Sequence, residues 1–262
     1  MSESALVSPL HYSPLESARF GLRVFRGNAA TIDARSLREA IAAEHVDVAI
    51  LRVPVQSPDS LARLAQAGLN PIVADTLVHY EVDLQERVAN APRDSRLRLR
   101  PAGAADADLL EAMARATFTG YVSHYSANPR FHASDILDGY AEWAARHVRS
   151  PADGAAAWIV ERDSQPVAFS CHRIQPSGEE AVGVLNGVLP EARGRGVYRD
   201  MLRAMLIEFA NRGAQRFVIS TQAHNTAVQR VWLDEWLRLT RSESTLHFNA
   251  SMPDRTWVFK RS

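Results

Sequence analysis

The stretch from Gly187 to Leu202 limits the fold of this chain more than any other part of the sequence. An apolar run enters a turn, Arg-Gly-Arg-Gly, which opens directly onto an amphipathic helix pattern. The first turn of a helix has main-chain N–H groups without partners and a positive dipole end. Glycine lets such a turn approach a ligand closely, and a diphosphate can accept hydrogen bonds from the free N–H groups. The stretch predicts a diphosphate site, although a simple connection with solvated arginines explains so short a motif about equally well.

Two other phosphate-binding turns fit this stretch less well. A Rossmann turn would need a third glycine near Arg199 and a following strand with an acidic residue, and the predicted strand at 216–222 has none. A P-loop would need Gly-Lys-Ser or Gly-Lys-Thr after the turn, which is missing. A second strand-to-helix junction at Asn225 adds weight to the diphosphate site.

The polar, proline-containing stretch 84–95 predicts a linker, and we expect domains at 1–92 and 93–262. Before it, strand patterns alternate with helix patterns and predict a small α/β domain; the strands are expected at 21–26, 46–53 and 71–83, and the helices at 36–44 and 60–67. After it, the patterns first predict a strand at 96–100 and two helices, capped by Asp106 and by Ser134. A hairpin of 157–161 and 167–174 and a strand at 181–189 are expected next. The last predicted elements are a helix from Val197 to Gly213, a strand at 216–222, a helix at 225–236 and closing strands at 237–249. The fold class expected is α/β (α+β).

Composition excludes several kinds of protein. Thirty basic residues balance thirty acidic residues, so no net field favours nucleic acid or an anionic membrane as a partner. Cys171 is the only cysteine, and the nine histidines show no metal-ligand spacing, so we expect no metal site. No secretory signal is evident, and no apolar run approaches the roughly 20 residues that span a bilayer. We expect a soluble cytoplasmic protein.

Two motifs carry a resemblance to a known family. Residues 188–202 resemble the acyl-CoA loop of the GNAT superfamily of N-acetyltransferases, whose pattern is Arg/Gln-x-x-Gly-x-Gly/Ala. Arg193 and Gly196 match its first two positions, whereas Tyr198 stands where a small residue is usual. Residues 221–232 are similar to the second signature, an asparagine followed by a helix against which pantetheine lies. The resemblance covers roughly residues 96–249 and implies a GNAT fold with a central mixed, mainly antiparallel sheet.

The resemblance also implies direct transfer of an acetyl group from acetyl-CoA to an amine. The residues that it assigns to the acetyl-CoA site are Val188, Leu189, Arg193, Gly194, Arg195, Gly196, Val197, Tyr198, Asn225 and Trp232. Backbone groups of the strand at residues 186–188 are expected to meet pantetheine and the thioester carbonyl. Gly187 is compatible with a bulge or splay there, and nearly as well with an ordinary strand glycine.

The candidate catalytic residues are Asn225, Tyr198 and His224. Many relatives have a tyrosine at the position of Trp232 that protonates the leaving thiolate, and an indole N–H can donate a hydrogen bond but cannot give up a proton near neutral pH. Tyr198 or another nearby group could serve instead, or water could, or the chain could be a silent binder of acyl-CoA. We expect Trp232→Phe to leave turnover nearly intact. His224 could exchange protons near neutral pH, although a helix-entry histidine is the simpler explanation, and Asn225 could act as an N-cap.

The likeness within the superfamily is strongest to dTDP-fucosamine acetyltransferases and related amino-sugar N-acetyltransferases. It is carried by the segments 16–22, 126–131 and 220–227. It implies a nucleotide-linked amino sugar as the acceptor, with another small-molecule amine, an antibiotic or a protein terminus as alternatives, and a homodimer as a possible assembly. The residues expected to contact the acceptor are Tyr121, His124, Tyr125, Asn128, Arg130, Phe131 and Asn186. Cys171 lies in an apolar strand pattern and is not expected to carry an acyl group.

Overall fold

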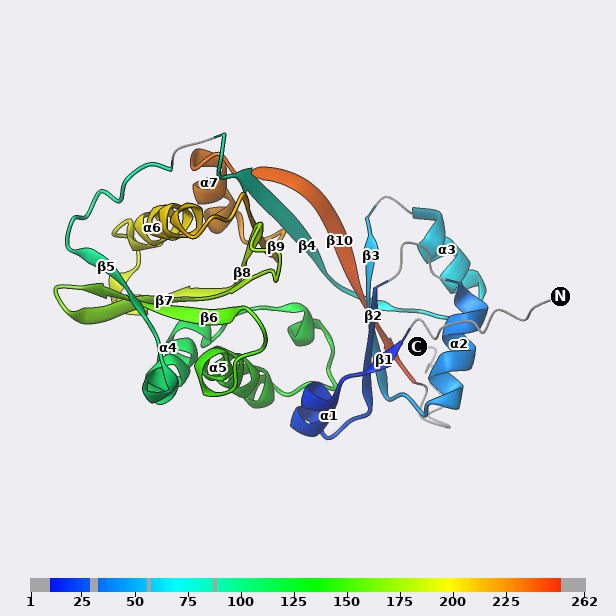
Figure 1. Cartoon of the computed structure of the whole chain (residues 1–262). Coiled ribbons are helices and arrows are strands. Elements are labelled where there is room, and N and C mark those ends of the chain that lie inside the picture. Colours follow the sequence, from blue (N-terminus) through cyan, green and yellow to red (C-terminus); the bar gives the residue numbers. More distant parts are fainter. Residues whose placement is uncertain (1–9, 29–32, 56–57, 87–88, 251–262) are drawn as a thin grey trace, which may run out of the picture. The chain divides into compact units, whose positions relative to one another are not determined.

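The computed structural model describes residues 10–28, 33–55, 58–86 and 89–250 (Figure 1). The chain divides into two compact units. The first contains Met1–Asp75, Ala127–Arg130 and Glu243–Ser262, and the second contains Thr76–Ser126 and Phe131–Ser242. The expected division between residues 92 and 93 falls inside the second unit, and it stays a prediction about how the chain divides into domains.

The first unit is a small sheet with helices. Its strands, in their spatial order, are β1 (His11–Tyr12), β2 (Val24–Asn28), β3 (Val48–Pro54) and residues 243–249 of β10 (Arg238–Asn249). Strands β2 and β3 are parallel, and the other neighbours are antiparallel. Its helices are α1 (Pro14–Phe20), α2 (Ala34–Ala43) and α3 (Pro58–Gln66). The sequence predicted α2, α3, β2 and β3 within a few residues, whereas β1 and α1 were too short to be recognised.

Alternation along these strands places successive side chains on two faces of the sheet that differ in composition. The apolar face includes Phe25, Leu51 and Phe248, and it packs with Leu37 of α2 and Leu64 of α3. The opposite face combines charged and polar side chains, such as Arg26 and Thr245, with the buried apolar side chains Val24, Val48 and Ile50. There the Glu16 carboxylate, which is 5% exposed, accepts hydrogen bonds of 2.5 and 2.6 Å from the Arg26 guanidinium. A buried carboxylate needs such a partner, since burial without one disfavours its charged form.

The second unit is built on a sheet with the strand order β4-β9-β8-β7-β6-β5. The bounds are β4 (Ile72–Asp83), β5 (Leu97–Pro101), β6 (Ala155–Arg162), β7 (Gln165–Ile174), β8 (Glu180–Val188) and β9 (Arg216–Gln222). Only β8 and β9 are parallel among these neighbours; the remaining pairs are antiparallel. The mixed, mainly antiparallel sheet expected from the sequence is confirmed.

Strand β4 supplies a finding that the sequence did not predict. Residues Leu77–Asp83 pair antiparallel with Gln222–Arg216 of β9. The sequence suggested that residues 71–83 complete the small N-terminal α/β domain, because strand and helix patterns alternate up to that point. Local patterning identifies a strand but not its partner, so the pairing with β9 could be seen only in the structure.

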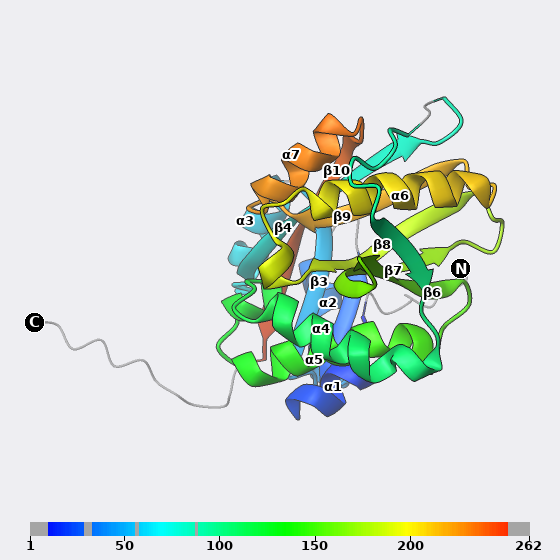
Figure 2. The ribbon, with the colours of Figure 1, turned by 90° about the vertical axis from the view of Figure 1, so that its left-hand side faces the viewer.

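Helices cover both faces of the second sheet (Figure 2). On one face lie α4 (Ala107–Phe118) and α5 (Ala133–Arg149), and on the other lie α6 (Val197–Asn211) and α7 (Thr226–Asp234). Short 3₁₀ turns lie at Ala104–Asp106, His124–Ala127 and Pro190–Ala192. Within the described residues, the helices lack the length and apolar character that crossing a bilayer requires.

Two expectations about helix α5 are wrong. The helix begins at Ala133 with His132 at the N-cap, so Ser134 lies inside the first turn instead of capping it. The sequence pattern places Trp143 on one face of this helix with Ile136, Leu137, Tyr140, Ala144 and His147, but Trp143 is 42% exposed. Both errors arise because the start of a helix is difficult to assign from sequence alone. An error of one residue changes the cap and rotates the assigned faces by about 100°.

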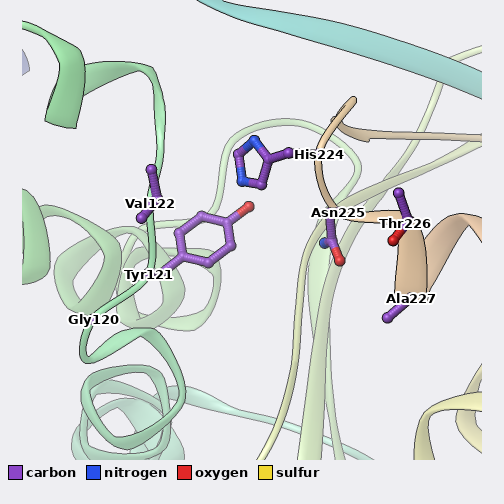
Figure 3. A pocket seen from close by; sticks show the side chains of 7 residues that line it. All are labelled: Gly120, Tyr121, Val122, His224, Asn225, Thr226 and Ala227. Carbon is purple, nitrogen blue, oxygen red and sulfur yellow. The ribbon is translucent and has the colours of Figure 1, made fainter.

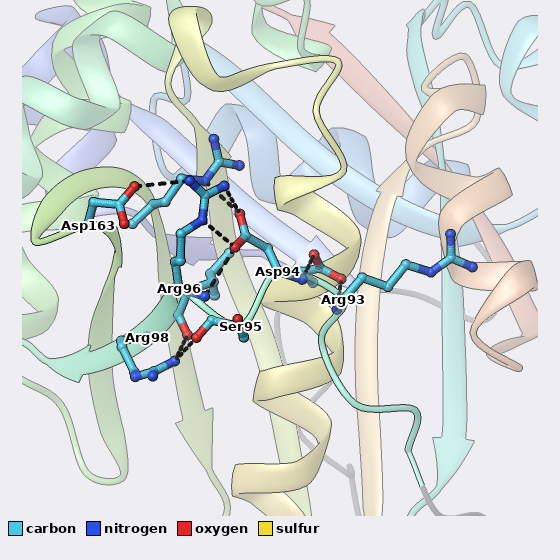
Figure 4. Close-up of polar contacts among 9 residues, drawn as sticks. Arg93, Asp94, Ser95, Arg96, Arg98 and Asp163 are labelled. Atoms are coloured by element: carbon cyan, nitrogen blue, oxygen red, sulfur yellow. Dashed lines mark hydrogen bonds and ion pairs between the residues drawn. The ribbon is translucent and has the colours of Figure 1, made fainter.

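The segment that leads into β5 is held by charged groups (Figure 4). The main-chain N–H groups of Arg93 and Asp94 donate to the two carboxylate oxygens of Asp200 on α6, at 2.9 and 3.1 Å. Arg96 donates to Asp94 and reaches Asp163, in the turn between β6 and β7, at 3.3 Å. Hydrogen bonds from Arg96 lower the pKa of Asp94 to about 2. The segment predicted as a linker is therefore fixed to α6 and to the β6–β7 turn.

Candidate active site

A wedge between β8 and β9 forms the centre of the candidate site. The parallel pairing of these strands runs from Glu180 with Arg216 to Gly183 with Ile219. Both strands continue beyond this point, β8 to Val188 and β9 to Gln222, and no pairing between them is recorded there among the described residues. The main-chain groups of residues 184–188 that face β9 are thus available to an extended ligand, as in β-strand addition.

The bulge in β8 does not lie at Gly187, although Gly187 belongs to the part of β8 that has separated from β9, which is the splay that was the other expectation there. The register shifts opposite Cys171 and His172, which pair with Leu185 and Gly183, so that Val184 is the extra residue. Gly187 itself pairs regularly with Phe169. A Cβ atom on Gly187 would lie 2.6 Å from the Phe169 ring and 2.7 Å from the Thr117 methyl group. Close packing against these side chains explains the glycine.

The turn before α6 exposes main-chain donors. Gly194 and Gly196 have φ angles of 72° and 78°, a left-handed conformation that side chains other than glycine rarely adopt. Among the described residues, no main-chain acceptor is recorded for the N–H groups of residues 194–199, and the first N–H bond of the helix is Asp200 to Gly196 at 3.1 Å. The turn therefore presents a row of free N–H groups at the positive end of a 15-residue helix.

The two arginines of the turn differ. Arg193 donates from Nε to the Val188 carbonyl at 3.1 Å and from Nη2 to the Thr117 carbonyl at 2.8 Å, so its guanidinium fastens the end of β8 to α4. Arg195 is exposed, and within the described part of the chain no ion pair is recorded for it. Of the two, Arg195 is the side chain available for an anionic ligand.

Tyr198, Trp232 and Asn186 meet on the face of the sheet that α6 and α7 cover. The Trp232 indole Nε1–H donates to the Tyr198 hydroxyl at 3.0 Å, and the Asn186 side-chain amide also acts on this hydroxyl as a donor. Burial raises the pKa of Tyr198 to about 12, although both donors act in the opposite direction. The Asn186 Oδ1 atom is buried, and no hydrogen-bond partner for it is found among the residues that the structure describes. The structure thus brings together three residues that the resemblance assigned to the donor and acceptor sites.

Buried charges hold α7 against α6 and so place Trp232 next to Tyr198. The Arg203 guanidinium, on α6, donates to Glu235 at 2.7 Å, and these residues are 6% and 4% exposed. Asn90 also donates to Glu235, at 3.2 Å. Breaking such a buried pair leaves an uncompensated charge, so the contact fixes the position of α7.

A pocket of about 440 Å³ opens beside the start of α7 (Figure 3). Its lining comes from the loop after α4 and from the β9–α7 junction, and it consists of Gly120, Tyr121, Val122, His224, Asn225, Thr226 and Ala227. Figure 3 shows the Tyr121 hydroxyl directed toward His224 and Asn225. The Tyr121 hydroxyl donates to the Gln222 side chain. Tyr121, His224 and Asn225, all predicted site residues, therefore share one pocket.

Asn225 occupies the N-cap position of α7 but makes no side-chain cap. Its amide donates instead to the Thr221 hydroxyl at 3.0 Å. Thr221 and Gln222, which hold Asn225 and Tyr121, were not predicted as site residues. A signal was present, because two polar residues end an apolar strand directly before the asparagine motif, where ligands often bind.

The other residues of the predicted acceptor loop divide between the two units. In the second unit, the His124 and Tyr125 rings lie 3.9 Å apart and Tyr125 packs edge-on against Phe131 at 5.5 Å. Asn128 and Arg130 belong to the first unit. There Asn128 donates to Asn249 at 2.9 Å, and Arg130 donates to the Asp47 carbonyl at 2.7 Å. Contact of Arg130 with a phosphate stays a prediction.

Two further groups can be placed. Cys171 is fully buried in β7, and burial raises the pKa of its thiol. Its sulfur lies 3.8 Å from the Ala144 carbonyl, which agrees with a packing role. Within the described ranges, no three His, Cys, Asp or Glu side chains lie close enough together to hold a metal ion.

Comparison with known protein families identifies the family of this chain. Residues 96–233, more than half of the chain, match the acetyltransferase (GNAT) domain. The chain belongs to the GNAT acetyltransferase family. The matched region includes the wedge, the glycine turn and the Tyr198–Trp232 pair. Proteins of this family use acetyl-CoA, so the chain is an acyltransferase with acetyl-CoA as its acyl donor.

Solved structures with similar folds include other GNAT proteins. A functionally unknown conserved protein from Staphylococcus epidermidis aligns with a TM-score of 0.64 at 12% identity, over 95% of this chain and 94% of its own. GNAT N-acetyltransferases from Sphaerobacter thermophilus and Kribbella flavida align with TM-scores of 0.59 and 0.57 at 11% and 14% identity. They cover 91% and 87% of this chain and 74% and 82% of their own. Identities this low establish a shared fold only. A search of curated proteins returned no significant match.

The residues of this GNAT protein fit the donor that the family uses. Acetyl-CoA brings a diphosphate, an extended chain with two amide groups and a thioester. The turn at 194–198 provides free N–H groups, and the unpaired stretch of β8 provides main-chain donors and acceptors along the wedge. The chemistry of these groups matches the diphosphate and the amides, respectively.

Proposed function

We propose that this protein transfers the acetyl group of acetyl-CoA to the primary amine of a small molecule, with the donor held along the wedge. The diphosphate accepts from the N–H groups of residues 194–198, with Arg195 beside it, and pantetheine follows residues 186–188 of β8. The row of free N–H groups at the start of α6 is the observation that carries this proposal. Val188, Leu189, Val197 and Asn225 complete the donor site.

The pocket beside α7 is the proposed entry for the amine. A neutral amine attacks the thioester carbonyl, so it must lose a proton as the bond forms. His224 is exposed at the pocket wall, and it is the candidate base. The Tyr121 ring, which packs edge-on against Phe118 at 5.3 Å, gives the pocket a rigid wall for the acceptor.

For the acceptor we propose a nucleotide-linked amino sugar. The support is the aromatic composition of the loop after α4, where the partly exposed rings of Tyr121 and Tyr125 offer surfaces for a base or a sugar ring. Phe131 is buried and packs against Tyr125, so its support for the acceptor is indirect. The sequence segments that resemble amino-sugar N-acetyltransferases point the same way. Asn186 would donate or accept at the sugar from the floor of the wedge.

Two measurements test the function. Titration calorimetry with acetyl-CoA should show one site per chain, and binding should weaken when ADP is added as a competitor for the diphosphate site. Release of the coenzyme A thiol should then be measured against nucleotide-linked amino sugars, the same amino sugars without nucleotide, polyamines and peptides with a free N-terminus. The proposal expects the highest kcat/KM with a nucleotide-linked sugar. A preference for peptides would refute the acceptor class but not the donor site.

A matched variant sharpens the acceptor test. Tyr121→Phe removes the hydroxyl that bonds to Gln222 but keeps the ring. It should raise KM for the amine by about tenfold or less, because one hydrogen bond contributes roughly 0.5–1.5 kcal/mol. Affinity for acetyl-CoA should stay unchanged. An equal loss in acetyl-CoA affinity would show that this pocket belongs to the donor.

A further inference from the structure

We propose that the Tyr198 hydroxyl donates a hydrogen bond to the departing sulfur of coenzyme A, and that Trp232 is a positioning residue that directs this hydroxyl. The inference rests on the proposed donor site and assigns the group that assists the leaving thiolate. It differs from a structural role for the Tyr198–Trp232 contact, in which the hydrogen bond would only join α6 to α7.

The donors and acceptors around the hydroxyl carry the inference. An indole N–H can only donate, so the Tyr198 oxygen must be the acceptor in its 3.0 Å contact with Trp232. The Asn186 amide also acts as a donor to this oxygen. A phenol oxygen with two incoming donors has its own hydrogen left to give, and no acceptor for that hydrogen is recorded among the described residues. The hydroxyl is therefore arranged to donate to a ligand.

The position of the three residues identifies the ligand atom. Tyr198 is the second residue of α6, directly after the turn proposed to hold the diphosphate. Asn186 lies on the part of β8 that has no pairing with β9. Both residues flank the wedge, one from the helix above it and one from its strand. A pantetheine chain that starts at the turn and enters the wedge would bring its sulfur to this hydroxyl.

Trp232 is held rigidly enough to direct a hydroxyl. Its side chain is 1% exposed, and its ring packs edge-on against Tyr80 with centroids 5.2 Å apart. The buried pair of Arg203 and Glu235 fixes the end of the same helix. The indole N–H therefore has one orientation, and it occupies one side of the Tyr198 oxygen permanently.

In the proposed step the amine nitrogen bonds to the thioester carbon, the carbon–sulfur bond breaks, and its electron pair stays on sulfur. The Tyr198 O–H stabilises the resulting thiolate by donating a hydrogen bond. The amine proton leaves through His224 or water, and the thiolate takes its proton from water. The tyrosine keeps its proton throughout, because its pKa of about 12 lies above the roughly 8.5 of an ordinary thiol.

The test is a double-mutant cycle. Tyr198→Phe should lower kcat by about 10- to 100-fold, since a hydrogen bond to a charged group contributes roughly 1.5–3 kcal/mol. Trp232→Phe should lower kcat by about 3- to 10-fold, and the double variant should be no slower than Tyr198→Phe alone. The readout is thiol release from acetyl-CoA, with the best amine of the panel or, if none is turned over, with water.

Tyr80→Phe is the matched control. It removes a hydroxyl that meets Gln229 at 3.1 Å but keeps the ring that packs on Trp232. Turnover should stay within about twofold of the parent. Additive losses in Tyr198→Phe and Trp232→Phe, or a normal kcat in Tyr198→Phe, would overturn the proposal.

A second measurement does not depend on turnover. The hydroxyl should lower the pKa of the thiol of bound coenzyme A, followed by the ultraviolet absorbance of the thiolate. Tyr198→Phe should raise that pKa by about one unit or more. An unchanged thiol pKa would contradict the proposal even if the variant were slow. Absence of acetyl-CoA binding in the parent protein would instead refute the proposed function.

Discussion

The two faces of the second unit's sheet are packed in different ways. Under α4 and α5, the buried cluster consists of apolar side chains such as Leu110, Phe118 and Phe169, together with the inert Cys171, and His147 of α5 is buried beside it. Under α6 and α7, an equally apolar cluster is accompanied by buried ionisable groups, which are His172, Asp200, Arg203 and Glu235. The buried charges fasten α7 and the segment before β5 to α6, next to the proposed donor site. We infer that changes on the α4–α5 face affect stability alone when they lie away from Phe118, whose ring packs against the pocket residue Tyr121. Changes on the α6–α7 face should affect stability and chemistry together.

The largest expected effect is on acetyl-CoA binding. Gly196→Asp places a carboxylate at the proposed diphosphate position and should weaken acetyl-CoA binding at least 100-fold, measured by calorimetry, since two anions are brought together at close range. Gly196→Asn is the matched control, because asparagine is similar in size and tolerates a positive φ angle. Equal losses in both variants would attribute the effect to the backbone and not to charge.

The buried ion pair should couple stability to turnover. Arg203→Met leaves Glu235 buried without its main partner and should lower the free energy of unfolding by about 3–5 kcal/mol. It should also lower kcat, because α7 carries Trp232. Leu110→Ala on the opposite face should cost about 2–5 kcal/mol of stability with kcat unchanged for the folded protein. Denaturant unfolding and kinetics on the same samples make the comparison. A normal kcat in Arg203→Met would contradict the inference that changes on the α6–α7 face affect chemistry as well as stability.

Acidity should destabilise the α6–α7 face through His172. Its ring stacks on Trp158 at 3.9 Å, and burial, with a smaller effect from Arg212, lowers its pKa from 6.5 to about 3. Between these values the unfolded chain binds a proton that the folded chain does not, so this contribution to stability is lost as pH falls from 6.5 toward 3. In His172→Phe, the free energy of unfolding should fall less steeply with decreasing pH, by up to roughly 1.4 kcal/mol per pH unit. Unfolding curves across this range test it, and an unchanged slope would contradict it.

The smallest effect is expected at Cys171. Cys171→Ala should cost about 1 kcal/mol of stability, like other losses of a small buried group. It should leave turnover within about twofold, since the thiol is buried and its raised pKa keeps it protonated. In the folded protein the thiol should also resist alkylation. Loss of activity in the variant would reopen an acyl-carrying role.

Local sequence patterns predicted most elements of the second unit because their signals are short-range. The strand β9 was expected at 216–222 and is found there, and α6 begins at Val197, as the glycine turn indicated. The pairing of β4 with β9 could not be predicted, since strand partners depend on contacts distant in sequence.

The candidate site was predictable in part for the same reason. The turn at 193–196 and Asn225 could be identified from local motifs, and the structure places them directly before α6 and α7. The bond between Trp232 and Tyr198 joins residues 34 positions apart on different helices. It changes one expectation: Trp232→Phe, expected to leave turnover nearly intact, should now slow it. The hydrogen bond from Arg130 to the Asp47 carbonyl could not be predicted either, because the sequence of a loop does not show which residue an arginine side chain contacts.

Strand β4 has a consequence for how this protein can be divided or recombined. Residues 77–83 come before the family-matched region, yet they cover the edge of β9, whose far end carries Thr221 and Gln222 beneath the pocket. A chain started after the polar stretch at 84–95 would expose that edge and offer it to neighbouring molecules. Gene fusions or domain exchanges intended to preserve catalysis should therefore be cut upstream of residue 76, where the second unit begins.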